Sequence, residues 1–169
     1  MITFQDYRLL DPDALETPAM LIFRDVMDHN IRSVCELVGG GENLFAHVKT
    51  HKSADVARRE VELGIQGFKC ATLKELEMVL EAGAVRAILS YPQCQAIKVE
   101  RLCDLVEAFP DAWIAAIASK PFHCDVLAAV AEQKEQVINV MLDIDAGMRR
   151  TGIDFGTDAE QLYRNIHVH

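Results

Sequence analysis

A short stretch at residues 44–52 contains the side chains that amine chemistry requires. It begins as an apolar run of strand-forming residues and ends in lysines and histidines. Side chains alternate along a strand, so the two faces of this one differ in character. One face carries Leu44, Ala46 and Val48, and the other carries Phe45, His47, Lys49 and His51. The change from apolar to polar marks the C-terminal end of the strand, where parallel α/β folds bind ligands.

Lys49 has the most distinctive surroundings in this stretch. A histidine stands two positions away on each side, at His47 and His51, and Lys52 follows closely. Positive neighbours, together with burial, favour the neutral form of an amine. A neutral amine at the end of a strand is the group that Schiff-base chemistry needs. The alternative is a solvated loop that simply starts where the strand ends, and the residue types alone are compatible with both.

A second polar segment accompanies the most hydrophobic predicted strand, at residues 137–144. Asn139, Asp143 and Asp145 share one face near its C-terminal end, opposite an aliphatic face. Acids and amides on the inside of a barrel, near the C-terminal ends of its strands, are candidates for function. The segment 143–152 contains two glycines that would let the chain turn sharply beside a ligand. Its alternative interpretation is a glycine-flanked surface loop with two exposed arginines.

Both segments resemble motifs of the fold-type III pyridoxal-phosphate enzymes, in the branch of D-threonine aldolase and D-serine dehydratase; alanine racemase is a better-known relative. Residues 47–52 (His-Val-Lys-Thr-His-Lys) are similar to the lysine motif, although Ala46 stands where the family usually has proline. The resemblance implies that Lys49 carries pyridoxal 5'-phosphate as an internal aldimine, with His47 and His51 beside it. Lys49 would then serve as a base at the α-carbon of the substrate.

The segment 143–152 resembles the acidic strand end, glycine, arginine and second glycine of the same family. On that match Arg150 takes the position near the phenolic oxygen of the cofactor ring, and Arg149 does not. A guanidinium there can stabilise phenolate charge. The segment 69–77 also looks like the family, with Thr72 opening a helix. The cofactor-binding residues implied are therefore Lys49, His47, His51 and Arg150.

Strands and helices are expected to alternate along the chain. Six strands are predicted, at 19–23, within 44–52, and at 67–71, 87–91, 113–118 and 137–144. Ser53 or Asp55 can cap the helix that follows the lysine strand. This alternation is typical of parallel βαβ units. A complete (β/α)₈ barrel needs about 250 residues, so 169 residues would form an incomplete TIM-type barrel of about six units. An open doubly wound parallel sheet is the alternative.

The composition excludes several classes of partner. The formal net charge of -9 argues against binding to nucleic acid or to anionic membranes. No apolar run approaches the roughly 20 residues of a membrane span, and the first residues lack the layout of a secretory signal. The five cysteines form no Cys-x-x-Cys pair, so buried free thiols are expected. A cytoplasmic location is the expectation.

The resemblance covers nearly the whole chain but only part of the family's length. It implies one domain, residues 1–169, that is the N-terminal portion of the barrel and lacks the family's C-terminal β-domain. That domain supplies a divalent metal site in the family, and no ligands for it can be assigned here. His167 and His169 could chelate a metal as a pair, and a frayed terminus is the alternative.

The predicted function is that of a pyridoxal-phosphate enzyme, or a fragment of one, acting on a small D-amino acid. The resemblance implies aldol cleavage, dehydration or racemisation, and does not choose among them. One alternative is a protein that binds the cofactor without catalysis. Another is an inactive, truncated barrel that self-associates, because unpaired strand edges favour homo-oligomers.

Overall fold

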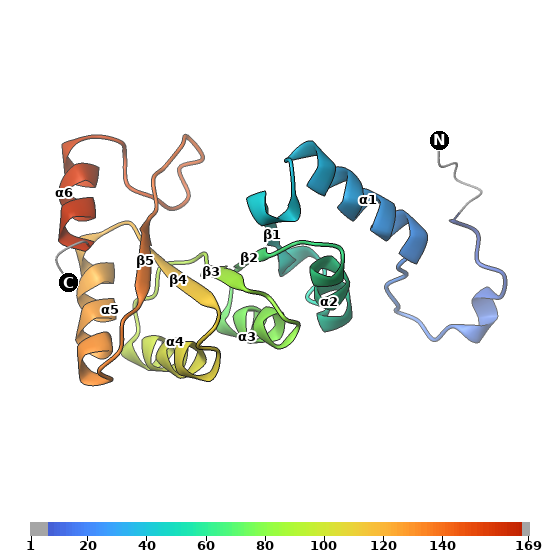
Figure 1. Ribbon diagram of the computed structural model, residues 1–169, viewed down its shortest axis with the longest axis horizontal. Coiled ribbons are helices and arrows are strands. Elements are labelled where there is room, and N and C mark those ends of the chain that lie inside the picture. The colour runs from blue at the N-terminus through green and yellow to red at the C-terminus, as the bar shows by residue number, and fades with distance from the viewer. Residues whose placement is uncertain (1–6, 167–169) are drawn as a thin grey trace.

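A parallel five-stranded sheet forms the centre of the computed structural model, which describes residues 7–166 (Figure 1). The strands are β1 (Phe45–His47), β2 (Gly67–Cys70), β3 (Arg86–Leu89), β4 (Trp113–Ala118) and β5 (Asn139–Leu142). The helices are α1 (Arg24–Leu37), α2 (Ala54–Glu62), α3 (Leu73–Glu81), α4 (Ala96–Ala108), α5 (Pro121–Gln133) and α6 (Thr157–Ile166). Each strand pairs in parallel with the next one in the chain.

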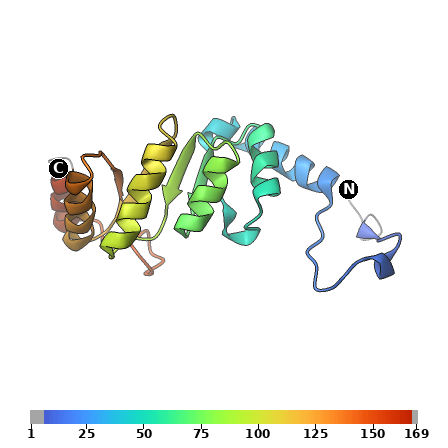
Figure 2. The ribbon, with the colours of Figure 1, turned by 90° about the horizontal axis from the view of Figure 1, so that it is seen from below.

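The strand order distinguishes the two architectures that the sequence predicts. The order in the sheet is β1-β2-β3-β4-β5, without any reversal. Crossovers of one hand then place every connecting helix on the same face, and Figure 2 shows α2, α3, α4 and α5 in a row along it. A doubly wound sheet reverses its strand order at a switch point. The incomplete barrel is therefore confirmed, and the doubly wound sheet is wrong.

The predicted first strand, residues 19–23, does not form. This segment is irregular and leads into α1, and Met20, Leu21 and Ile22 are exposed. A strand exists only where a neighbouring strand accepts and donates its backbone hydrogen bonds. Within residues 7–166 the sheet ends at β1, and no strand lies along its outer edge. The described chain thus contains five strands instead of six.

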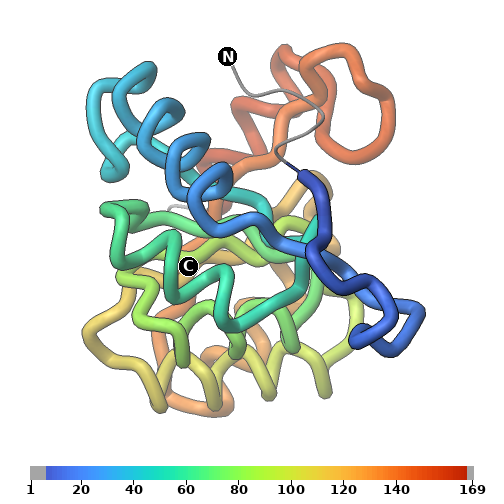
Figure 3. The backbone as a smooth tube through the Cα atoms, turned by 90° about the vertical axis from the view of Figure 1, so that its right-hand side faces the viewer, coloured from blue at the N-terminus to red at the C-terminus, as the bar shows by residue number. Residues whose placement is uncertain are grey.

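The core lies between the sheet and its helices because the strands are apolar on that side. Phe68, Leu89, Ile114 and neighbouring residues are buried there with side chains from α3 and α4. Burying a large aliphatic or aromatic side chain contributes about 1.5–3 kcal/mol. Helix α1 lies beyond the β1 end of the sheet and contributes Ile31 to the same core. Both α1 and the loop after β5 project away from α3 and α4 (Figure 3).

Local sequence signals set the helix starts. The Ser53 hydroxyl accepts a hydrogen bond from the Val56 N–H at 3.3 Å, so Ser53 and not Asp55 caps α2. Thr72 caps α3 in the same way, as predicted. Helix α1 is tied to α2 by Arg59, whose guanidinium donates to both carboxylate oxygens of Asp28 at 2.8 and 2.5 Å.

The expectations for the cysteines, for membrane spans and for the C-terminal histidines have different outcomes. Cys70, Cys103 and Cys124 are buried free thiols, whereas Cys94 is exposed because it lies in the loop before α4. No helix within residues 7–166 is long and apolar enough to cross a membrane. The proposed chelating pair at the C-terminus, His167 and His169, lies outside the described residues.

Candidate functional site

A cavity of about 430 Å³ lies on the sheet face opposite the core helices. Each of the five strands contributes one or more inward side chains to its wall: Phe45, His47, Lys69, Ile88, Ile117 and Met141. These positions alternate with the residues that pack against the helices, such as Phe68, Cys70 and Leu89. Alternation along each strand therefore builds two surfaces, a buried core and the wall of a concave site.

Lys49 lines this cavity from the turn that follows β1. The strand ends at His47, and Val48–Thr50 form one turn of 3₁₀ helix. Val48 is completely buried and anchors the turn in the core, while Lys49 is exposed on the opposite side. Lys49 thus stands just after a strand end, as the sequence predicts, and lines a cavity; binding of a ligand there stays a prediction.

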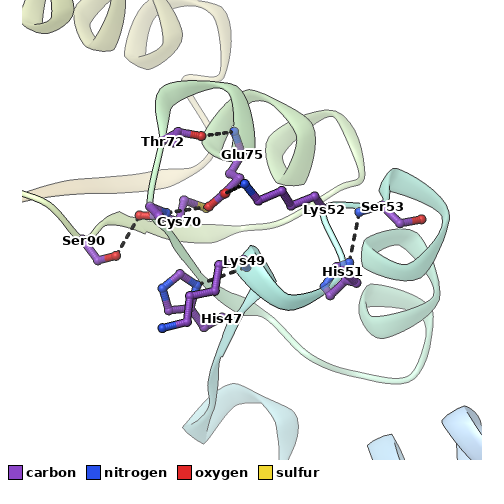
Figure 4. Close-up of polar contacts among 10 residues, drawn as sticks. His47, Lys49, His51, Lys52, Ser53, Cys70, Thr72, Glu75 and Ser90 are labelled. Atoms are coloured by element: carbon purple, nitrogen blue, oxygen red, sulfur yellow. Dashed lines mark hydrogen bonds and ion pairs between the residues drawn. The ribbon is translucent and has the colours of Figure 1, made fainter. Parts of the chain in front are cut away.

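His47 lies beside Lys49 and shapes the turn directly (Figure 4). Its Nδ1 accepts a hydrogen bond from the Lys49 backbone N–H at 3.3 Å. Burial, followed by the nearby positive charges of Lys49 and Lys69, lowers the pKa of His47. The ring is thus held in its neutral form, and a neutral imidazole that accepts at Nδ1 carries its proton at Nε2.

His51 does not share the face of Lys49, so that expectation is wrong. The 3₁₀ turn breaks the strand alternation after His47 and directs His51 toward α2. His51 Nδ1 accepts from the Ser53 N–H at 3.1 Å, and its Nε2 lies 3.6 Å from Glu60 Oε2. Burial lowers the pKa of His51 and raises that of Glu60 to about 7. Contact between His51 and a cofactor stays a prediction.

Arg150 reaches the same cavity from the loop after β5. Asp145 holds this loop through Oδ1, which accepts from the backbone N–H groups of Gly147 at 2.8 Å and Arg149 at 2.9 Å. Gly152 is required where it stands, because a Cβ there would lie 2.4 Å from the Asp145 nitrogen. The structure thus brings together three of the four predicted site residues: Lys49, His47 and Arg150.

Two further residues of the cavity were not assigned a role from the sequence. Asp143 lines the wall, and its buried Oδ2 accepts no hydrogen bond from the described residues. Lys69 projects into the cavity from β2, directly beside His47 in the strand register. The sequence feature that could have identified Lys69 is its position between two apolar residues, Phe68 and Cys70, on a short strand. A charged residue at such a position must face away from the core.

The charges of the cavity suit an anionic ligand with a reactive carbonyl. The cavity contains the basic side chains of Lys49, Lys69 and Arg150, and none of the described residues forms an ion pair with them. Asp143 offers the complementary acceptor. Over residues 7–166 no group of three or more His, Cys, Asp or Glu side chains could hold a metal ion. The amine and guanidinium groups of the cavity suit amine and charge-assisted chemistry.

Comparison with known proteins identifies relatives along most of the chain. Residues 22–169 match the model of the alanine racemase N-terminal domain. The chain is 31% identical over 146 residues to the D-threo-3-hydroxyaspartate dehydratase of Delftia sp. (strain HT23), covering 82% of this chain and 36% of that protein. It is 24% identical over 146 residues to the 3-hydroxy-D-aspartate aldolase of Paracoccus denitrificans (strain Pd 1222), covering 85% of this chain and 37% of the aldolase.

Solved structures show the same fold. The D-threonine aldolase from Filomicrobium marinum superposes with a TM-score of 0.79 at 24% identity, over 89% of this chain and 40% of that one. The dehydratase from Delftia sp. HT23 gives 0.76 at 26% identity, over 92% and 41%. This chain thus spans well under half the length of the relatives it matches. With the family model matching residues 22–169, the chain belongs to the alanine racemase N-terminal domain family.

Proposed function

We propose that this chain binds pyridoxal 5'-phosphate covalently through Lys49, as the cofactor-binding part of an enzyme that acts on D-amino acids. The observation that carries the proposal is the convergence of Lys49, His47 and Arg150 on one cavity. These residues come from two distant segments of the chain, and both segments resemble motifs of the family. We take residues 1–169 as one domain, the N-terminal portion of a barrel.

The residues present fit this cofactor. It is an anionic aldehyde, and the cavity offers the Lys49 amine together with two further cations, Lys69 and Arg150. The buried Asp143 Oδ2, which accepts no hydrogen bond within the described chain, provides an acceptor for a protonated ring nitrogen or an ammonium group. Barrel phosphate sites commonly come from the loops after strands 7 and 8, and residues 7–166 contain five strands.

Each side chain has a distinct task in the proposed reaction. Lys49 Nζ would hold the cofactor through its aldehyde carbon, with loss of water. The bound cofactor supplies a sink for the electron pair released at the substrate α-carbon. When it is not bonded to the cofactor, Lys49 Nζ would take or return a proton at that carbon. Neutral His47 fixes the lysine turn through the Lys49 N–H, and Arg150 stabilises negative charge on the ring oxygen.

The proposed substrate is a small D-amino acid with a hydroxyl group on the β-carbon. The names of the relatives describe a D-threonine aldolase and enzymes of 3-hydroxyaspartate, and the cationic wall of the cavity suits the carboxylates of such compounds. Aldol cleavage, dehydration and racemisation share the same first steps at Lys49. We propose a lyase, and the five free cysteines suit a cytoplasmic location.

The test is a titration of the 169-residue chain with pyridoxal phosphate, followed by visible absorbance. The wild-type chain should develop the visible band of a lysine-bound cofactor, and Lys49→Ala should abolish it. Lys98→Ala, on the exposed face of α4, is the matched control and should leave the band unchanged. Persistence of the band in Lys49→Ala would remove the assignment. If the band depends on Lys49, turnover of D-threonine and D-serine is measured next, to identify which reaction the chain catalyses.

A second candidate is a chain that binds the cofactor or self-associates without turnover. The observation that favours it is the open sheet, because the outer edges of β1 and β5 are unpaired among the described residues. We propose a homo-oligomer on the same ground. Formation of the Lys49 band without reaction of any D-β-hydroxy amino acid would support this candidate.

A further inference from the structure

The buried carboxylate of Glu75 connects two loops at the C-terminal ends of β1 and β2. Its side chain is only 5% exposed. Oε2 accepts a hydrogen bond from the Ala71 N–H at 2.6 Å, and Thr72 Oγ1 accepts one from the Glu75 N–H at 3.1 Å. These bonds form the start of α3. They occupy one carboxylate oxygen and leave the other, Oε1, for a second task.

The second task is an ion pair with Lys52. The Lys52 Nζ lies 3.4 Å from Glu75 Oε1, which has no hydrogen-bond partner among the described residues. A buried carboxylate oxygen left without a compensating charge is costly, so this ammonium matters more than one on an exposed pair. Figure 4 shows the Lys52 side chain extended toward Glu75 and away from Lys49.

Lys52 closes the turn that presents Lys49. The Lys52 N–H donates to the Val48 carbonyl at 2.9 Å, and the His51 N–H donates to the same carbonyl at 3.2 Å. Lys52 adopts φ 48°, in the left-handed region that residues other than glycine seldom occupy. A conformation of this kind persists only where its surroundings hold it in place. The ion pair with Glu75 is such a restraint.

The end of β2 gives this restraint a rigid base. The Cys70 carbonyl, one residue before Ala71, accepts hydrogen bonds from both the Ser90 backbone N–H at 2.7 Å and the Ser90 hydroxyl at 2.8 Å. The Glu75 carboxylate is therefore held at the end of β2, which is itself bonded to the end of β3, and Lys52 contacts its other oxygen. A continuous set of contacts runs from the centre of the sheet to the lysine turn (Figure 4).

We propose that Glu75 is a positioning residue that acts through Lys52 to hold the Lys49 turn against the cavity. The same ion pair separates the two neighbouring lysines: Lys49 lines the cavity, and Lys52 does not. Glu75 thereby directs the reactive aldehyde to Lys49. The restraint itself rests on contacts within the chain. Its effect on cofactor binding rests on the proposed function.

Two variants separate the restraint from the helix cap. Glu75→Gln keeps an acceptor for the Ala71 N–H but removes the charge that faces Lys52. Lys52→Met removes the ammonium and leaves α3 intact. Glu77→Gln is the control, because it breaks the exposed Lys74–Glu77 pair on the same helix, at 2.8 Å. Lys52→Arg retains a cation and should behave as the wild type.

Hydrogen exchange on the chain without cofactor tests the restraint. The amides of His51 and Lys52 should exchange about tenfold faster in Glu75→Gln and in Lys52→Met, while amides of β3 and β4 stay unchanged. Pyridoxal phosphate should bind Lys49 about tenfold more weakly in both variants, and borohydride reduction should fix more label on Lys52 in Glu75→Gln. If Glu75→Gln unfolds the chain, both measurements are made on Lys52→Met instead, because the Lys52 side chain is largely exposed and its replacement should leave the fold intact.

The possible outcomes separate the two proposals. Unchanged exchange at His51 and Lys52 would overturn the restraint, and unchanged cofactor affinity with faster exchange would overturn the positioning role. A wild-type chain that forms no adduct on Lys49 would contradict the proposed function instead. The exchange measurement would still decide whether Glu75 and Lys52 hold the turn.

Discussion

Lys49 takes its position from the change of backbone conformation directly after His47. Three extended residues bring the chain to the rim of the sheet, and one 3₁₀ turn follows. Buried Val48 on one side of that turn leaves Lys49 on the cavity side. The two flanking histidines, which look equivalent in the sequence, consequently have different environments. His47 belongs to the cavity, and His51 belongs to the start of α2.

The choice between the two adjacent arginines is the sharpest test at the residue scale. Arg150→Met should weaken binding of pyridoxal phosphate tenfold or more, since a hydrogen bond to a charged group contributes about 1.5–3 kcal/mol. Arg149→Met should leave the affinity within about twofold, because Arg149 contributes its backbone N–H to Asp145 and does not line the cavity. Equal losses in the two variants, measured by absorbance titration, would contradict the assignment of Arg150.

Residue types at a strand end singled out Lys49 and His47, the family resemblance singled out Arg150, and the structure places all three on one cavity. Their roles at a cofactor stay predictions. Residue types and spacing could not place His51, since the 3₁₀ turn that redirects it depends on burial of Val48 in the tertiary core. Lys69 was not singled out from the sequence, and Asp143 was named as a functional candidate without a specific role. Their convergence with Lys49 follows from the strand register, which a single sequence does not specify.

At the scale of elements, α2 and the turn before it bring together two partly buried groups, Glu60 and His51, whose pKa values shift in opposite directions. Burial raises the pKa of Glu60 to about 7 from a usual value near 4.5, and lowers that of His51. His51 and Glu60 lie 3.6 Å apart, with side chains 15% and 13% exposed. A neutral histidine offers little compensation to an ionised carboxylate. The folded state therefore prefers Glu60 protonated, and this preference is lost as the pH rises through about 7.

Replacement of Glu60 should change the pH dependence of stability in a defined direction. Because the pKa is raised in the folded state, the stabilising contribution is complete below the unfolded value and disappears above the folded one. The free energy of unfolding of Glu60→Gln, taken relative to that of the wild type, should thus increase by up to about 3 kcal/mol between about pH 5 and about pH 8.5. Urea unfolding at the two pH values measures this difference.

Glu62→Gln provides the control for this experiment, because Glu62 is exposed on the same helix and pairs with Arg59 at 2.7 Å. Its effect should be small and nearly independent of pH. If the free energies of unfolding of Glu60→Gln and wild type ran parallel between the two pH values, the raised pKa of Glu60 would be disproved.

Most elements could be predicted because their apolar runs, caps and turns agree locally, as at Ser53 and Thr72. The segment 19–23 shows where local signals fail. Its residues suit a strand, but a strand forms only beside another strand, and among the described residues β1 has a single neighbour, β2. The length of β5 was overestimated for a similar reason, since only Asn139–Leu142 pair with β4.

The whole molecule is an open, curved sheet with apolar surface at both ends. The exposed segment containing Met20, Leu21 and Ile22 leads into α1, at the β1 end of the sheet. At the β5 end, a cavity of about 550 Å³ is lined by α5, the residues before β5 and Ile166. This cavity is larger than the one at Lys49 but offers no amine, so it is better explained as a packing surface. Unpaired edges and apolar surface favour association.

Self-association should follow from this shape. The chain is expected to form a dimer or a larger oligomer at low micromolar concentration, as measured by light scattering. Val137→Lys, at a residue that is 84% exposed beside the free edge of β5, should shift the equilibrium toward monomer. Val85→Lys, next to the central strand β3, should have no such effect. A monodisperse wild-type monomer would contradict this prediction.

The central claim is that Lys49 is the cofactor-binding residue of this chain, and chemical mapping tests it most directly. Pyridoxal phosphate is added to the wild-type chain, borohydride reduces the complex, and peptide mass spectrometry locates the label. One dominant adduct is expected on Lys49, with little label on Lys52 or Lys69. Label scattered over surface lysines such as Lys98 and Lys134, or absent altogether, would contradict it.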